Sequence, residues 1–172
     1  FQPILSAKNG EIIAYEALMR SQLATLKNPE MILKIAREEN KLEDVERICI
    51  FKSTETFDQL RKNKLVKEDA LLFINSIASV SLNDEDRTRF HHYFSHIQSQ
   101  LVVEVTEEEN MSEEPLIRKR ETEGFSGMFA LDDYGSGYNT EINLLNLNPK
   151  YIKIDLTIVR DIDKDFDKQQ LV

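Results

Sequence analysis

Five short apolar runs constrain this sequence most, because each carries or ends in a residue that can bind a hard metal ion or transfer a proton. The runs and these residues are Ile12 to Met19 with Glu16, Leu71 to Ile74 followed by Asn75, Leu101 to Val105 with Glu104, Met128 to Leu131 followed by Asp132 and Asp133, and Tyr151 to Ile154 with Lys153. A short β-rich apolar segment is typical of a buried strand, where an unpaired charge costs several kcal/mol. Amphipathic helical stretches separate the runs. This alternation predicts parallel strands whose carboxyl ends meet at one polar site, as at the top of a β/α barrel.

Turn and cap signals indicate the remaining elements. Lys8 to Glu11 reads as a turn between Gln2 to Leu5 and the first long run, which predicts an antiparallel hairpin. Asn28, followed by proline and glutamate, predicts the start of a helix that reaches about Asn40. Further helices are predicted from Leu42 past Leu60, over Asp84 to Gln98, over Ser112 to Glu123 and at the end of the chain.

Charge and cysteine content exclude several classes of partner and site. The chain has 22 basic and 31 acidic residues, for a formal charge of −9, which argues against DNA, RNA or an anionic membrane surface as the main partner. Cys49 is the only cysteine, which excludes a disulfide framework and a Cys-based zinc site and favours the reducing cytoplasm. No apolar run approaches the ~20 residues that span a bilayer, although a membrane anchor upstream of Phe1 stays open.

The same residues resemble the EAL family of cyclic di-GMP phosphodiesterases. The motifs that carry this resemblance are Tyr15-Glu16-Ala17-Leu18-Met19-Arg20, Phe73-Ile74-Asn75, Glu104-Val105-Thr106-Glu107, Leu131-Asp132-Asp133-Tyr134-Gly135-Ser136-Gly137-Tyr138 and Lys153-Ile154-Asp155. Five ordered motifs at family-like spacings span nearly the whole chain. The resemblance implies a TIM-like β/α barrel of EAL type with an antiparallel first strand, formed by a single domain over residues 1–172.

The resemblance also implies the activity and the limits of this chain. The expected reaction is metal-dependent hydrolysis of cyclic di-GMP to linear pGpG, with a homodimer formed through the barrel and a possible upstream GGDEF or sensory domain. Family members continue for roughly 70 residues with another glutamate and a glutamine, so the last strands are expected to be absent here and the 172-residue chain is expected to be inactive. The alternative is a degenerate EAL module that acts as a non-catalytic cyclic di-GMP receptor or protein-interaction domain.

Oxygen ligands alone line the predicted metal site. Such a set suits Mg²⁺ or Mn²⁺ better than Zn²⁺, while Ca²⁺ is expected to bind but support little reaction. The resemblance implies two ions. By resemblance the metal ligands are Glu16, Asn75, Glu104, Asp132 and Asp133, with Asp132 bridging and Asp133 belonging mainly to the second ion.

The catalytic assignment is Lys153 together with Glu16 and Asp132. Lys153 is expected to orient or deprotonate the attacking water with a lowered pKa, and a structural ion pair with Asp132 or Glu104 is the alternative. Asp132 and Asp133 taken alone are also typical of a turn or a helix cap.

Other assignments come from the resemblance, or from local pattern. Gln2, Leu18 and Arg20 are the expected substrate-binding positions. Gly135 and Gly137 are expected to give the loop after Asp133 its conformational freedom, and Glu107 is expected to stabilise this mobile loop. The surrounding apolar positions indicate that the three histidines, His91, His92 and His96, are surface residues of a helix and not zinc ligands. Asp155 is expected to be structural.

Overall fold

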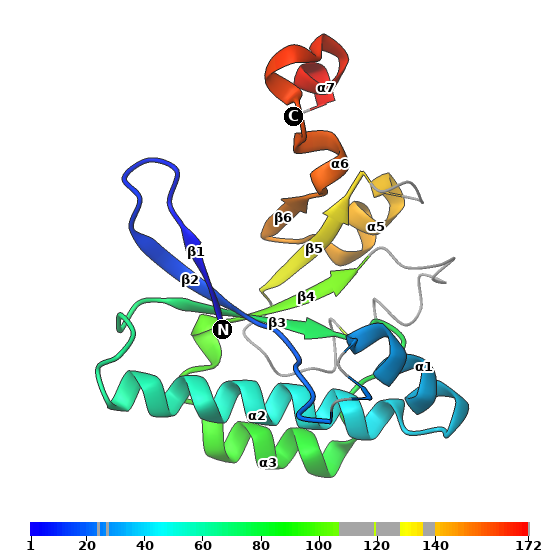
Figure 1. The fold of residues 1–172 in the computed structure, drawn as a ribbon. Helices are drawn as coiled ribbons and strands as arrows, with labels where there is room; N and C mark the ends of the chain where they lie inside the picture. Colours follow the sequence, from blue (N-terminus) through cyan, green and yellow to red (C-terminus); the bar gives the residue numbers. More distant parts are fainter. Residues whose placement is uncertain (24, 27, 107–118, 120–127, 136–139, 172) are drawn as a thin grey trace.

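A computed structural model describes residues 1–23, 25–26, 28–106, 119, 128–135 and 140–171. Its centre is a six-stranded sheet with the order β1 to β6. The strands are β1 (Gln2–Leu5), β2 (Ile12–Ala17), β3 (Leu71–Ser76), β4 (Leu101–Thr106), β5 (Phe129–Tyr134) and β6 (Tyr151–Ile154). β1 and β2 are antiparallel, and every later pair of neighbouring strands is parallel. The sheet curls into part of a barrel, so the predicted α/β fold of EAL type and its antiparallel first strand are confirmed (Figure 1).

Helices follow or connect most of the strands. They are α1 (Pro29–Glu38), α2 (Leu42–Lys62), α3 (Asp84–Phe94), α5 (Thr140–Leu147), α6 (Leu156–Val159) and α7 (Phe166–Leu171), with short 3₁₀ turns η1 (Gln98–Gln100) and η2 (Ile162–Lys164). Asn28 caps α1 as predicted, since its side-chain oxygen accepts a hydrogen bond of 2.9 Å from the Glu30 amide. Asp155 caps α6 by accepting from the Thr157 amide at 2.7 Å, which gives it the structural role that we expected.

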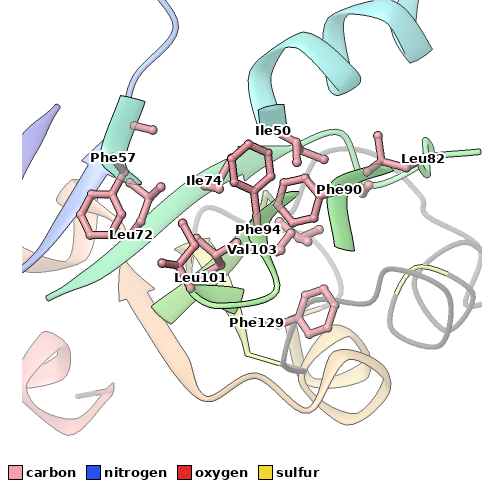
Figure 2. Packing of buried hydrophobic residues seen from close by; sticks show 14 of the residues in the cluster. Ile50, Phe57, Leu72, Ile74, Leu82, Phe90, Phe94, Leu101, Val103 and Phe129 are labelled. Atoms are coloured by element: carbon pink, nitrogen blue, oxygen red, sulfur yellow. The ribbon is translucent and has the colours of Figure 1, made fainter. Parts of the chain in front are cut away.

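One face of the sheet packs against the two helices α2 and α3 (Figures 1 and 2). Leu72 and Ile74 of β3 lie in one buried cluster with Phe57 of α2 and Phe90 and Phe94 of α3. Phe57 is fully buried, and burying a side chain of this size contributes roughly 1.5–3 kcal/mol to stability. This packing fixes the sheet on its outer side.

The other face of the strands carries a smaller apolar cluster inside the curl of the sheet. Ala14, Phe73, Val102, Met128 and Ala130 form it, and the Phe73 and Tyr151 rings meet edge to face at 5.2 Å. Successive side chains of a strand point to opposite faces, so the residue two places after each of these points to the same interior.

The observed boundaries differ from the predicted ones in informative places. β2 ends at Ala17 rather than at Met19. Ala17 pairs with Ile74 of β3, and this is the last pair between the two strands. β5 continues through Asp132 and Asp133 to Tyr134, which pairs with Ile154 of β6. The predicted helix over Ser112 to Glu123 lies outside the described residues except for Lys119. None of the described helices is long and apolar enough to cross a membrane.

Candidate active site at the carboxyl ends of the strands

Strand geometry brings the predicted site residues together. Each of five predicted site residues comes two positions after a residue of the interior apolar cluster, or after a residue packed against that cluster. The five are Glu16, Asn75, Glu104, Asp132 and Lys153. They therefore point into the same interior, one step closer to the carboxyl ends of their strands. The pairing register agrees with this, since Asn75 lies opposite Glu104.

Three carboxylates and one ammonium form the centre of this site. Ligand oxygens of Glu16, Glu104 and Asp132 lie within 4.8 Å of one another. The Lys153 Nζ atom lies 2.7 Å from Glu104 Oε1, 3.0 Å from Asp132 Oδ2 and 3.3 Å from Glu16 Oε1. Like charges this close require a cation between them, and Lys153 supplies one here.

Glu104 is the most buried member of the group. Its side chain is 0% exposed, and its two oxygens accept no hydrogen bond from the described residues beyond the ion pair with Lys153. The pKa of Glu104 is raised to about 7, mainly by burial; Lys153 opposes this rise, and the charges of Glu16 and Asp132 add to it. A buried carboxylate with Lys153 as its only described partner is a group whose burial a hard cation would further compensate.

The Lys153 ammonium is held in its charged form, contrary to expectation. Burial acts to lower the pKa of Lys153, but the contacts with Glu104 and Asp132 outweigh it and raise the pKa above its usual value. The prediction of a lowered pKa was therefore wrong. The ion pairs that we gave as the alternative for Lys153 are present with both of the predicted partners.

The other two predicted metal ligands lie at the rim of this cluster. Asn75 donates to Glu16 Oε1 at 3.3 Å, which leaves its amide oxygen available to a cation. Asp133 follows Asp132 on β5 with an exposed side chain and a backbone φ of 57°, and its amide donates to Asp132 Oδ1 at 3.0 Å.

Gly135 has a φ of 94°, as predicted for a turn residue, and a Cβ there would collide with Ile158.

A cavity of about 930 Å³ opens beside the site and shares Asn75 with it. Leu18 and Arg20, two of the three expected substrate-binding residues, line this cavity. Arg37 and Lys52 add positive charge to its wall. Gln2 lies exposed on β1 opposite Glu16 in the strand register, next to the carboxylates.

Two other sequence assignments have different outcomes. Glu107 and Gly137 lie outside the described residues, so their assignment stays a prediction. The three histidines are exposed, as predicted, and the helix ends at Phe94, before His96, whose Nε2 contacts Asp58 Oδ1 at 2.9 Å.

Sequence reasoning missed a buried polar cluster behind Asn75. Glu46 of α2 and Lys119 are 1% and 0% exposed and form an ion pair of 2.8 Å, with the Ser76 hydroxyl donating to the same carboxylate. The available signal was helical periodicity, because Glu46 falls on the face of α2 that buries Ile50 and Phe57.

Comparison with known proteins decides the family. The family model of the EAL domain matches residues 1–172. The chain belongs to the EAL family. No curated protein sequence matches it.

Solved structures with the same fold include several EAL proteins. The PaMucR phosphodiesterase, solved as a c-di-GMP complex, has a TM-score of 0.77 at 22% identity, over 99% of this chain and 71% of that one. An EAL domain protein from Listeria monocytogenes has a TM-score of 0.74 at 20% identity, over 99% and 68%. BlrP1 of Klebsiella pneumoniae, solved with manganese and cyclic di-GMP, has a TM-score of 0.72 at 23% identity, over 99% and 43%. These likenesses establish the EAL fold of this chain.

Proposed function

We propose that this EAL domain hydrolyses cyclic di-GMP to linear pGpG in a reaction that requires divalent cations. The observation that carries the proposal is the convergence of Glu16, Glu104 and Asp132 within 4.8 Å at the strand ends, beside a cavity large enough for a ligand. EAL structures with this fold that were solved with cyclic di-GMP, among them those of PaMucR and BlrP1, support the choice of substrate.

The donor set of the site fits Mg²⁺ or Mn²⁺. Glu16, Asn75, Glu104 and Asp132 would hold the first ion through oxygen atoms, and Asp133 would help to hold a second ion together with Asp132. Bound divalent cations supply a nucleophilic water at neutral pH and stabilise charge on the phosphoryl oxygens. Ca²⁺ is proposed to bind the same ligands and support little turnover, because its coordination is larger and looser.

The remaining residues orient the reacting groups. In the proposed reaction the Lys153 ammonium holds and orients the attacking water by donating a hydrogen bond to it, and the raised pKa keeps this donor charged at neutral pH. Arg20 is proposed to donate two parallel hydrogen bonds to a phosphate, with Gln2 and Leu18 contacting the rest of the dinucleotide. Arg37 and Lys52 in the cavity wall favour an anionic ligand near this strongly acidic centre.

The resemblance to the family extends the proposal to assembly. We propose that residues 1–172 belong to a single EAL domain and that the natural protein forms a homodimer through the barrel. Light scattering of the purified natural protein measures its mass directly. A monomer at micromolar concentration would contradict the dimer and leave the hydrolytic reaction unaffected.

Hydrolysis by the full-length natural protein tests the proposal. Separating nucleotides after incubation with Mn²⁺ should reveal linear pGpG, and EDTA should abolish its formation. Glu16→Gln should lower turnover by at least about a hundredfold, whereas the matched control Glu11→Gln should leave it unchanged, since Glu11 is 61% exposed and pairs with Lys67 on the surface. Turnover in EDTA, or full activity of Glu16→Gln, would refute the proposal. Cyclic di-GMP binding without turnover would instead identify a non-catalytic receptor.

A further inference from the structure

Glu46 and Lys119 are almost completely buried, although charged groups of this kind are rarely buried. Removing two charges from water is costly, and apolar residues of similar volume often stabilise a fold equally well in such a place. Fold stability therefore gives little reason for a charged pair at this position. Its other contacts indicate a different role.

Both charged groups bind the main chain that follows β3. Glu46 Oε2 accepts a hydrogen bond of 2.8 Å from the Ile77 amide, and Lys119 Nζ donates to the Ile77 carbonyl oxygen at 3.0 Å. Lys119 also donates to the Val80 carbonyl oxygen, and the Ser76 hydroxyl donates to Glu46 Oε1. Two charged side chains thus hold both the amide and the carbonyl group of one residue, Ile77.

The held segment begins directly after Asn75. β3 ends at Ser76, so the strand pairing with β4 no longer fixes the backbone from Ile77 onward. Asn75 is the residue that the carboxylate cluster and the cavity share, and its amide donates to Glu16. A shift of the chain at Ser76 and Ile77 would move the Asn75 side chain relative to the carboxylates.

We propose that Glu46 and Lys119 are positioning residues of the metal site: they hold the backbone after β3 and thereby orient Asn75 towards Glu16. This inference rests on the proposed metal-binding function. Groups that orient a metal ligand typically contribute about 10- to 100-fold to metal affinity. The pair therefore acts on metal binding without contacting the ion, through the backbone of Ile77, and Glu46 also lines the neighbouring cavity.

The experiment measures the dissociation constant of Mn²⁺ by calorimetry, with the full-length natural protein and no nucleotide. Lys119→Met keeps the length of the side chain and removes its charge, and Glu46→Gln keeps one acceptor for Ile77. Both variants should raise the Mn²⁺ dissociation constant by about 10- to 100-fold, at a temperature well below every melting transition. Ile50→Ala is the matched control, because Ile50 is 1% exposed one turn further along α2 and is expected to lower the melting temperature without changing Mn²⁺ affinity.

Each outcome decides the inference. Folded variants that bind Mn²⁺ within twofold of the wild type would overturn it and show that the pair serves only stability. Where Lys119→Met does not fold, the double variant Glu46→Gln/Lys119→Met removes both charges together and decides in the same way. A wild type that binds no Mn²⁺ would refute the proposed function along with this inference, so the two failures are distinguishable.

Discussion

Removing the Lys153 ammonium tests the electrostatics of the site most sharply. In Lys153→Met three carboxylates keep their positions without the cation that now lies 2.7 Å to 3.3 Å from each of them. Breaking a buried ion pair by removing one partner costs about 3–5 kcal/mol. We expect the free energy of unfolding to fall by an amount near the lower end of this range, about 3 kcal/mol, because the Lys153 side chain is 29% exposed and partly screened by water.

This loss should depend on pH with a defined sign. Lys153 lowers the pKa of Glu104, so its removal should raise that pKa above the wild-type value of about 7. At pH 8 the wild type keeps an ionised Glu104 paired with Lys153, a pair that the variant lacks, whereas at pH 6 Glu104 is mostly protonated in both proteins. The destabilisation should therefore be larger at pH 8. In a protein of this size about 3 kcal/mol corresponds to roughly 6–12 °C in melting temperature.

Thermal unfolding followed by circular dichroism measures the effect, in EDTA and in Mn²⁺. Mn²⁺ at a hundredfold excess over its dissociation constant stabilises by about 2.7 kcal/mol, which should return the variant close to the metal-free wild type. Lys164→Met is the matched control, since Lys164 is 72% exposed in a local surface pair. A Lys153→Met melting temperature equal to that of the control in EDTA would refute this reasoning.

Turnover of the same variant separates chemistry from binding. If Lys153 orients the attacking water, kcat should fall by about 10²- to 10⁴-fold while the affinity for cyclic di-GMP stays nearly unchanged. Lost affinity with an unchanged kcat would make Lys153 a phosphate contact instead.

Three further predictions concern the ligands and the turn after β5. Because the pKa of Glu104 is about 7 and metal binding needs the carboxylate, Mn²⁺ affinity measured by calorimetry should fall about tenfold per pH unit below 7 and level off above 8. A pH-independent affinity between 5 and 7 would contradict this. Asn75→Ala should weaken Mn²⁺ binding about tenfold with little change in melting temperature, and unchanged binding would remove Asn75 from the ligand set. Gly135→Ala should destabilise the fold by more than about 1 kcal/mol, because its φ is 94° and the new Cβ meets Ile158; equal denaturant midpoints for variant and wild type would show that the turn adapts.

The sequence predicts the strands of this domain well because their signals are local. Strand β6 begins and ends at the predicted residues, and β3 and β4 extend only two residues and one residue beyond their apolar runs. Alternation along these strands also predicts that Asn75 and Glu104 share a site, since residues at the same depth of neighbouring parallel strands meet. The longer extent of β5 depends on its pairing with β6, which no local pattern records.

Other features depend on distant parts of the chain. The raised pKa of Lys153 results from carboxylates on two other strands, whereas local sequence pattern predicted the opposite direction. The Glu46 and Lys119 pair joins residues 73 positions apart, so the partner of a charge on a buried helix face is invisible to local analysis. The family resemblance also did not point to this pair.

The location of bound metal tests the central claim most directly. Crystals of the natural protein soaked in Mn²⁺ and measured at the manganese absorption edge give the ion position independently of any turnover. We predict an anomalous peak within coordination distance, about 2.0–2.4 Å, of oxygens from Glu16, Glu104 and Asp132. No peak among these three carboxylates, or a peak only at the surface histidines, would contradict the account.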